Sequence, residues 1–503
     1  MAFLGIDVGT SGCKAILIDA SGQVLAEATH EYPLSTPRPL WSEQAPDDWW
    51  NAAIASIRAA IQQGGAAVDA IGLTGQMHGL VLLDDAGNVL RPAILWNDQR
   101  TGDECRTLTE RIGAETVLRL TGNPLLPGFT APKIEWVRRN EPQVFERIRR
   151  ILLPKDYLRY RLSGESFTEV SDASGMSLLD VGRRAWSPEM LDALGVKTAW
   201  LPTVTESIVP STRVSPAAAA ATGLKAGTPI IGGGGDQAAQ AVGAGVVHEG
   251  TVAVTLGTSG VVFAPMNAYR PEPKGRLHAF CHAAPGKWHL MGVMLSAAGS
   301  LRWYRDALCA PEHATATAGG RDVYDELVGA ATQIPAGSEG LLFLPYLTGE
   351  RTPHPDPLAR GAFVGLTIRH TKAHLTRAVL EGVSFGLRDS LELMRGLGVA
   401  PNEVRVSGGG AKSALWRQIL ADIFKTDVVR SNVSQGAAFG AAILAAVGVG
   451  ALSSVEAAAD AIVHEVDRTR PGVDAARYDA VYRQYTALYP LLKGEFAALG
   501  SLE

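Results

Sequence analysis

The tetrapeptide Gly9-Thr10-Ser11-Gly12 occurs a second time in the chain, as Gly257-Thr258-Ser259-Gly260. An apolar run precedes each copy and another follows it, which predicts a strand, a glycine turn and a second strand in both places. The copies lie about half of the 503-residue chain apart, roughly one domain length. We therefore expect two similar α/β domains, residues 1–247 and 248–503. The alternative is two unrelated hairpins that share a tetrapeptide by chance.

The composition is that of a folded enzyme and excludes several other classes of protein. The chain is 46% hydrophobic, 19% charged and 7% aromatic, with a formal net charge of -5. A chain of this charge offers no polybasic surface, so neither nucleic acid nor an anionic membrane is expected as a partner. The four cysteines are scattered without CxxC spacing, which favours a reducing, cytoplasmic setting.

Two segments bear on targeting and membranes. The chain starts within an apolar run that ends at Asp7, with no basic segment before it, so no signal peptide is expected. Residues 431–455 carry no charge, and 11 of the 25 are Ala or Gly. Small residues permit close backbone approach, so this segment predicts a buried, tightly packed helix rather than a membrane span.

Helical and strand patterns alternate through the rest of the chain. Residues 47–62 and 131–149 predict helices, the second interrupted by Pro142, and residues 70–73 and 341–344 predict short buried strands. Residues 477–499 predict a C-terminal helical region broken at Pro490. The alternation indicates layered α/β architecture.

Two aspartates stand beside glycine-rich strand ends. Asp7 directly precedes the first turn, where its carboxylate can lie near backbone N–H groups that suit phosphate oxygens, or can simply brace the turn. Asp236 follows an apolar and glycine run, residues 230–235, and opens a helical pattern. Glycines permit close approach of a substrate, and a helix N-terminus favours an ionised Asp. Asp236 is therefore a candidate functional carboxylate, with an N-cap as the simpler alternative.

A third glycine turn, residues 408–410, is followed by Lys412-Ser413. A phosphate-binding P-loop would need Gly directly before Lys-Ser and another opening the motif, whereas Ala411 and Val406 stand there. We expect instead a glycine platform that a flat nucleotide can approach. Residues 434–438 begin a second small-residue helix that could close the other side, although helix packing explains it nearly as well.

Polar side chains gather after two further apolar runs. Gln76, Met77 and His78 lie between Gly75 and Gly79, and Trp96-Asn97-Asp98 follows residues 93–95. Amide, imidazole and carboxylate groups can bind sugar hydroxyls while an aromatic face covers C–H groups, so both segments could line a polyol site. Each residue could equally be a satisfied core residue. His278 and His282 have zinc-protease spacing, but Ala279 replaces the required Glu, so no structural zinc is expected.

Taken together, these motifs resemble the FGGY family of carbohydrate kinases. Residues 128–136 (GFTAPKIEW) are similar to the first family signature, and residues 361–381 (GAFVGLTIRHTKAHLTRAVLE) to the second. Residues 41–44 (WSEQ), 75–79 (GQMHG), 153–157 (LPKDY) and 344–354 (LPYLTGERTPH) look most like the bacterial kinases of a ketopentose sugar. Gln237 stands where some of these have Asn.

The resemblance implies a fold, cofactors and roles. Both halves would have a ribonuclease-H-like fold of the actin/Hsp70/hexokinase type, with the active site in the cleft between them. ATP and Mg²⁺ would be required, and Asp236 would be the general base, ionised at neutral pH because a loose transition state needs no raised pKa. The ATP residues would be Gly9, Thr10, Ser11, Gly257, Thr258, Ser259, Gly409, Gly410 and Lys412. The sugar residues would be Met77, His78, Trp96, Asp98, Asp236 and Gln237, and the metal residues Asp7 and Asp236.

Two rival functions remain at this point. One is an FGGY kinase for another sugar or polyol, such as ribulose, gluconate, fuculose, glycerol or erythritol. The other is a non-catalytic nucleotide switch, which would exchange or hydrolyse ATP without phosphorylating a sugar; a sugar pocket beside Asp236 argues against it. A homodimer is a family-level expectation only, and the sequence leaves open the open-chain or cyclic form of the sugar, the kinetic constants and any regulation.

Overall fold

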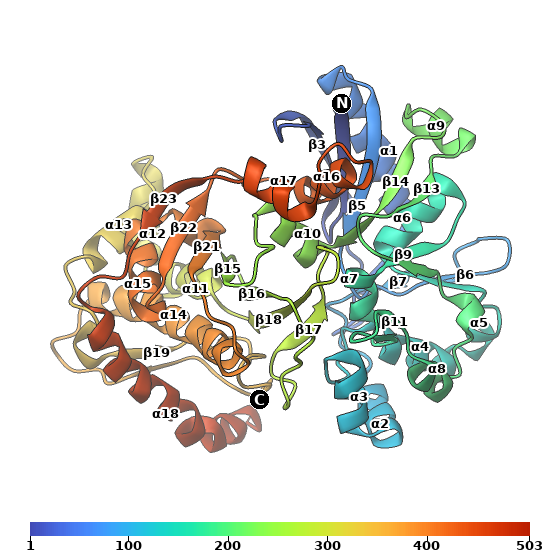
Figure 1. Cartoon of the computed structure of the whole chain (residues 1–503). Coiled ribbons are helices and arrows are strands. Elements are labelled where there is room, and N and C mark those ends of the chain that lie inside the picture. Colours follow the sequence, from blue (N-terminus) through green and yellow to red (C-terminus); the bar gives the residue numbers. More distant parts are fainter. Residues whose placement is uncertain (503) are drawn as a thin grey trace.

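The computed structural model describes residues 1–502, and its two large β-sheets lie in two lobes (Figure 1). The first sheet has the strand order β13-β14-β5-β1-β2-β3. Its central strands β14, β5 and β1 run parallel, whereas β2 runs antiparallel to both of its neighbours, β1 and β3. The strands are β1 (Ala2–Val8), β2 (Gly12–Asp19), β3 (Val24–Glu31), β5 (Val68–Gly75), β13 (Pro210–Arg213) and β14 (Pro229–Gly235).

The second sheet has the order β17-β18-β16-β15-β21-β22-β23. Strands β15, β21 and β22 are parallel, and β15, β16 and β18 are antiparallel. The strands are β15 (Thr251–Leu256), β16 (Gly260–Met266), β17 (His278–Cys281), β18 (Trp288–Met294), β21 (Glu403–Ser407), β22 (Asp427–Ser431) and β23 (Glu465–Thr469).

The two sheets share one topology. On one side of β1 and of β15 lie two strands that pair antiparallel in succession. On the other side lie two parallel strands and then an antiparallel one, β13 or β23. Strand β17 is an addition at the free edge of β18. The prediction of two similar α/β halves is confirmed, and in both halves the repeated tetrapeptide joins the first two strands as expected.

The helices cover the sheets and connect their strands. The predicted helix at residues 47–62 is α1 (Pro46–Gly64), and the interruption at Pro142 separates two further helices as expected. The helices that follow α1 in the first half are α2 (Gly102–Ile112), α3 (Ala114–Thr121), α4 (Thr130–Asn140), α5 (Pro142–Glu146), α6 (Pro154–Ser163), α7 (Val170–Ala173), α8 (Pro188–Leu194), α9 (Pro216–Thr222) and α10 (Asp236–Gly243). Those of the second half are α11 (Ala298–Leu308), α12 (Ala310–Ala318), α13 (Val323–Ala331), α14 (Lys372–Gly396), α15 (Ala414–Phe424), α16 (Ala437–Gly448), α17 (Val455–Ile462) and α18 (Ala475–Gly500).

Short strands and 3₁₀ turns complete the chain. Residues 341–344 were expected to form a short strand and do so as β19. The short strands are β4 (Glu43–Gln44), β6 (Val81–Leu83), β7 (Ala93–Ile94), β8 (Arg150–Leu152), β9 (Phe167–Glu169), β10 (Leu179–Asp180), β11 (Ala185–Trp186), β12 (Thr203–Thr205), β19 (Leu342–Leu344) and β20 (Ala362–Val364). The 3₁₀ turns are η1 (Ser174–Met176), η2 (Thr198–Trp200), η3 (Ser338–Gly340) and η4 (Gly409–Lys412).

The C-terminal helix differs from the prediction. Helix α18 continues through Pro490 instead of breaking there. Proline removes one backbone hydrogen bond and crowds the preceding turn, but Tyr485 and Tyr489 on one side and Phe496 on the other are buried against the same core. Tertiary packing therefore holds both halves of the helix in place despite the proline.

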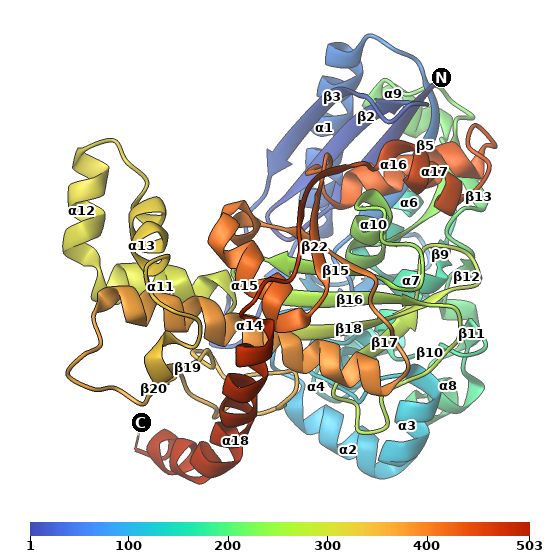
Figure 2. The ribbon, with the colours of Figure 1, turned by 60° about the vertical axis from the view of Figure 1, so that its left-hand side comes forward.

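Helix α16 crosses from the second half of the chain onto the first sheet. It packs against β1, β5 and α10, and its place beside β5 and α10 can be followed in Figures 1 and 2. The approach is so close that a Cβ added to Gly5 or Gly72 would lie within 2 Å of an α16 carbonyl oxygen, that of Ala438 or Ala441. The uncharged segment is thus a buried, tightly packed helix, as predicted, and no helix within residues 1–502 is long and apolar enough to cross a membrane.

Candidate active site

The first glycine turn is held by side chains that bind its carbonyl oxygens. The carbonyl of Gly9 accepts hydrogen bonds from the Tyr32 hydroxyl at 2.5 Å and from the Gln76 amide at 3.2 Å. The Gln44 amide donates to the carbonyl of Thr10 at 2.7 Å. In the described part of the chain, the backbone N–H groups of Thr10 and Ser11 have no partner. A turn with fixed carbonyls and free N–H groups suits an anion such as phosphate.

Trp96 belongs to this turn as well as to the predicted sugar wall. Its indole N–H donates to the hydroxyl of Thr10 at 2.9 Å, and that hydroxyl donates to the side chain of Gln76 at 3.3 Å. The indole is 41% exposed. The structure therefore brings Trp96 to the first glycine turn and leaves part of its ring exposed.

The second turn is braced by the start of α11. The carbonyl of Thr258 accepts from the backbone N–H groups of Ala297 and Gly299, at 2.9 and 3.1 Å, and Arg302 donates to its hydroxyl at 3.3 Å. Among residues 1–502, nothing accepts a hydrogen bond from the backbone N–H groups of Thr258 and Ser259. The two turns are thus alike in their free N–H groups, although different elements brace them.

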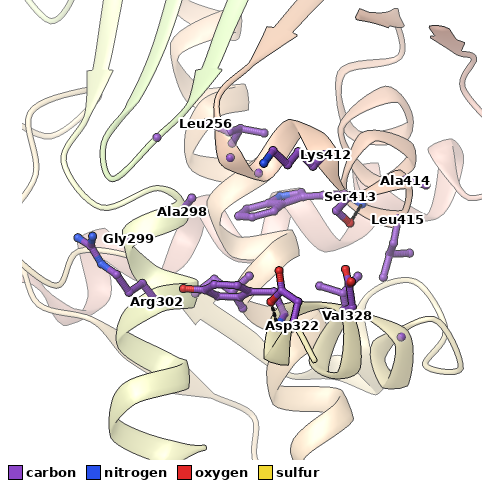
Figure 3. A pocket seen from close by; sticks show the side chains of 18 of the residues that line it. Leu256, Ala298, Gly299, Arg302, Asp322, Val328, Lys412, Ser413, Ala414 and Leu415 are labelled. Carbon is purple, nitrogen blue, oxygen red and sulfur yellow. Dashed lines mark hydrogen bonds between the residues drawn. The ribbon is translucent and has the colours of Figure 1, made fainter. Parts of the chain in front are cut away.

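A cavity of about 740 Å³ opens beside the second turn (Figure 3). Five of the predicted nucleotide residues line it, while Ser259 of the same turn does not. In Figure 3, Asp322 and Val328 lie on one side of the cavity and Lys412 and Ser413 on the other. The predicted residues in its wall are Gly257, Thr258, Gly409, Gly410 and Lys412.

Residues 408–410, the glycine platform, leave little space for side chains at two of their three positions. Gly408 has φ +87°, and a Cβ there would lie 2.5 Å from the carbonyl oxygen of Leu256. At Gly410 a Cβ would lie 3.0 Å from the ring of Trp416, whereas Gly409 faces open space. The backbone can therefore approach a flat ligand at Gly409, in a conformation that Gly408 permits.

One wall of the cavity was not predicted. It comes from α13 and the residue on either side of it, and it has no glycine motif or charge run that sequence reasoning could use. The residues from this wall are Asp322, Tyr324, Asp325, Val328, Gly329 and Thr332.

Asp7 and Asp236 come from neighbouring strands of the first sheet. Asp7 on β1 and Gly234 on β14 both pair with Thr74 of β5, which lies between them, and Asp236 opens α10 directly after β14. Burial raises the pKa of Asp7 to about 6. Burial, followed by the charge of Asp7, raises the pKa of Asp236 to about 7 against hydrogen bonds from Gln237. The expectation of an ordinary Asp236 pKa is wrong, because desolvation and a like charge outweigh the helix N-terminus.

The two carboxylates fit Mg²⁺ held jointly with a nucleotide. Oδ1 of Asp7 is buried and has no partner within the described residues. No group of three or more His, Cys, Asp or Glu side chains in residues 1–502 could hold a metal by itself. Mg²⁺ is commonly bound by one or two carboxylates together with substrate phosphates, so these residues suit it.

Met77 and His78 lie next to the glycines before Asp236. A Cβ on Gly235 would be 3.1 Å from Cγ of Met77. Nδ1–H of His78 donates to the carbonyl of Gly175 at 2.7 Å, and its ring stacks on Phe129 with centroids 4.4 Å apart. Burial lowers the pKa of His78 to about 3, so the ring is neutral and Nε2 keeps its lone pair. Phe129 belongs to a quoted family signature but had no role assigned.

Asp98, which was predicted to line the sugar site, has hydrogen bonds within the protein to both of its carboxylate oxygens. Its Oδ2 accepts from the backbone N–H of Ser42 at 2.6 Å and from Nη2 of Arg100 at 2.7 Å. Its Oδ1 accepts from the backbone N–H and from Nε of Arg100, and the side chain is fully buried. Both oxygens are therefore committed within the protein, and Asp98 anchors the segment that carries Trp96.

Comparison with known proteins agrees with this geometry. Models of the N-terminal and C-terminal domains of the FGGY family of carbohydrate kinases match residues 2–243 and 252–449. The xylulose kinase of Escherichia coli (strain K12) is 42% identical, over 97% of this chain and 100% of that protein. The gluconokinase of Bacillus subtilis (strain 168) is 31% identical, over 99% of this chain and 98% of that protein.

Solved structures extend the likeness to three dimensions. The crystal structure of xylulose kinase from Rhodospirillum rubrum superposes with a TM-score of 0.92 at 32% identity, covering 99% of this chain and 100% of that one. This chain thus contains both family domains in the expected order, and its relatives match it along nearly their full length. The chain belongs to the FGGY family of carbohydrate kinases.

Proposed function

We propose that this enzyme transfers the γ-phosphoryl group of ATP to the terminal hydroxyl of D-xylulose and releases D-xylulose 5-phosphate. The observation that carries the proposal is Asp236, a carboxylate with a pKa of about 7 at a glycine-rich strand end, beside a phosphate turn and next to Met77. The full-length xylulose kinase relatives support the choice of sugar.

ATP occupies the space between the two turns in this proposal. The adenosine lies in the 740 Å³ cavity, against Gly409, and its phosphates extend past Thr258 toward Thr10. The free N–H groups of both turns bind phosphate oxygens. Positioning of this kind contributes much of the catalysis in phosphoryl transfer, where the protein does little covalent chemistry.

Asp7 and Asp236 would hold Mg²⁺ together with the phosphates. When bound, the cation neutralises charge on the phosphate oxygens. Asp7 brings a carboxylate oxygen that lacks any protein partner in residues 1–502. The same cation favours the ionised forms of both carboxyl groups, whose pKa values are otherwise raised to about 6 and 7.

Asp236 accepts the proton from the attacking sugar hydroxyl. A base with a pKa near the working pH combines a large ionised fraction with adequate proton affinity. His78 orients the sugar, because its Nε2 accepts a hydrogen bond from a hydroxyl while Gly175 fixes the ring. Trp96 supplies an exposed aromatic face beside the turn.

The proposal includes a cellular setting and an assembly state. All four cysteines are unpaired and buried, in keeping with the cytoplasm as the place of the reaction. A homodimer is proposed from the family expectation alone, and size-exclusion chromatography with light scattering tests it directly.

A coupled assay of ADP release tests the function. D-xylulose, D-ribulose, gluconate, L-fuculose, glycerol and erythritol are compared at equal concentrations with Mg-ATP. We expect the highest kcat/KM with D-xylulose. A higher value with another acceptor would refute the choice of sugar while leaving the kinase in place, and ADP release that no acceptor stimulates would refute the sugar kinase itself.

A further inference from the structure

The segment that carries Arg351 is fixed to the second sheet where β17 and β18 meet the first half of the chain. Thr352 donates its N–H to the carbonyl of Val293 at 3.0 Å, and its hydroxyl donates to the carbonyl of Arg276 at 2.9 Å. On the other side of Arg351, Glu350 accepts from the N–H of Leu295 at 3.0 Å. Arg276 lies two residues before His278, the first residue of β17. Arg351 is therefore held next to His278.

The guanidinium of Arg351 is half-buried and unpaired. It forms no hydrogen bond or ion pair within residues 1–502. Burial lowers its pKa against the charge of the neighbouring Glu350, and its own charge helps to lower the pKa values of His78 and His278. A cation taken out of water without a partner is costly, so the position is better explained by a ligand that supplies acceptors.

His278 is held in one orientation with a free ring nitrogen. The amide of Asn123 donates to the carbonyls of Thr121 and Ala279, so its oxygen is the acceptor that faces Nδ1 of His278 at 2.8 Å. Nδ1 thus carries the proton, and Nε2 has no partner in the described residues. Burial keeps the ring neutral by lowering its pKa.

Both imidazoles contact the ring of Phe129. The centroid of that ring is 4.4 Å from His78 and 5.8 Å from His278. His78 comes from the first half of the chain, whereas His278 and Arg351 come from the second. Two imidazoles, one from each half, therefore meet at one aromatic ring beside the sugar site, and the charge of Arg351 acts on both of them.

We propose that Arg351 and His278 form a second wall of the sugar site, in which the guanidinium of Arg351 donates hydrogen bonds to oxygen atoms of the acceptor sugar. The inference rests on the proposed function and deepens it. A guanidinium only donates, whereas Nε2 of a neutral histidine accepts, so Arg351 pairs with carbonyl or hydroxyl oxygens and His278 with a hydroxyl proton. This donor and acceptor set fits a polyhydroxylated ketone.

Steady-state kinetics of Arg351→Met and Arg351→Lys test the proposal. In Arg351→Met, KM for D-xylulose should rise about 10- to 100-fold, the effect of losing hydrogen bonds from a charged group, while KM for ATP stays within about twofold. Arg351→Lys keeps the charge but not the planar guanidinium, so its KM for D-xylulose should lie between the values of the wild type and Arg351→Met. Calorimetry without nucleotide should show the same loss of D-xylulose affinity. The control is Arg369→Met, which removes an exposed arginine paired with Glu339.

Two outcomes would overturn the inference. One is an unchanged KM and affinity for D-xylulose in both Arg351 variants. The other is a fall in kcat with a changed KM for ATP alone, which would place Arg351 on the phosphoryl group instead. Thermal unfolding checks that the variants fold, and Arg351→Lys carries the test if Arg351→Met does not. A wild-type enzyme that phosphorylates no sugar would refute the proposed function, which is a separate result.

Discussion

The two halves share a strand topology and a turn, yet the residues beside the turns differ in charge. Asp7 stands two residues before Gly9, and Thr255 stands two residues before Gly257. The hydroxyl of Thr255 is 3.2 Å from that of Ser407, an uncharged pair. Strand β14 leads into Asp236, whereas β22, its counterpart in the second sheet, ends at Ser431.

This difference separates the two tasks of a kinase. In the proposed mechanism, the first half supplies the carboxylates of Asp7 and Asp236 as cation ligands and proton acceptor. Beside the second turn, the second half has the neutral hydroxyls of Thr255 and Ser407, and a carboxylate at that place would repel phosphate. The two halves have the same sheet topology and the same turn, and single residues at the strand ends determine the role of each half.

The largest effect is expected at Asp236. Asp236→Asn keeps the shape but removes the proton acceptor, so kcat should fall about 100- to 10,000-fold. Stopped-flow or coupled measurement of ADP release gives kcat. The matched control is Asp192→Asn, at an exposed aspartate in α8. If Asp236→Asn retained near wild-type kcat, the assignment of the base to the first half would be wrong.

The next effect is expected at Asp7, which is changed to threonine, the residue that the second half has at the equivalent position, Thr255. In Asp7→Thr, activity at low Mg²⁺ should fall on the order of 100-fold, because a carboxylate ligand of the charge-neutralising cation is lost. Excess Mg²⁺ should restore part of the activity, and calorimetry of Mg-ADP binding gives a readout independent of turnover. Asp19→Asn, on the same hairpin and bonded to Ser21, is the control. Unchanged Mg²⁺ dependence would remove Asp7 from the metal site.

Local patterns explain how much of this could be predicted from the sequence. The turns at Gly9 and Gly257 and the glycine platform at Gly408 were predictable, because glycine at a strand end signals a turn whatever surrounds it. Residues 437–448 were predictable as a buried helix because small residues favour close packing, which Gly5 confirms from the facing strand.

The remainder depends on contacts between distant segments. The pKa of Asp236 is set by burial and by Asp7, which is far away in the sequence. Pro490 is tolerated because the helix around it packs on the core. Nothing in the sequence around Asp98 indicates that Arg100, two residues later, donates hydrogen bonds to its carboxylate. The α13 wall of the nucleotide cavity has an ordinary helical sequence.

A third test gives the second half a charge like that of the first. Thr255→Asp should raise KM for ATP about tenfold, because a carboxylate beside the second turn repels the phosphates. Thr255→Asn is the control, since it has the size of Asp without the charge. Isothermal titration with ATP should show the same ratio between the two variants. Equal affinities in Asp and Asn variants would mean that charge at this position does not separate the two halves.

The smallest effect is the pH dependence of activity, which we assign to the titration of Asp236 in the first half. With a pKa of about 7, Asp236 is mostly ionised at pH 8 and mostly protonated at pH 6, so kcat/KM for D-xylulose should fall about tenfold between them. More Mg²⁺ should move this limb to lower pH, because the cation favours the ionised carboxylate. The residual activity of Asp236→Asn should lack the limb. A limb that persists in the variant would assign it to another group.

The pH dependence of thermal stability tests the same titration independently of activity. The folded pKa of Asp236 lies above its unfolded value of 3.8, so its contribution to stability is present at low pH and is lost as pH rises through about 7. Without ligands, the melting temperature of Asp236→Asn relative to wild type should therefore increase from pH 5 to pH 8. The corresponding exchange at Thr255, to Asn, carries no titrating group and should give a difference that does not vary with pH. A constant difference at Asp236 would mean that the carboxyl group is not desolvated, and the contrast between the halves would then rest on position alone.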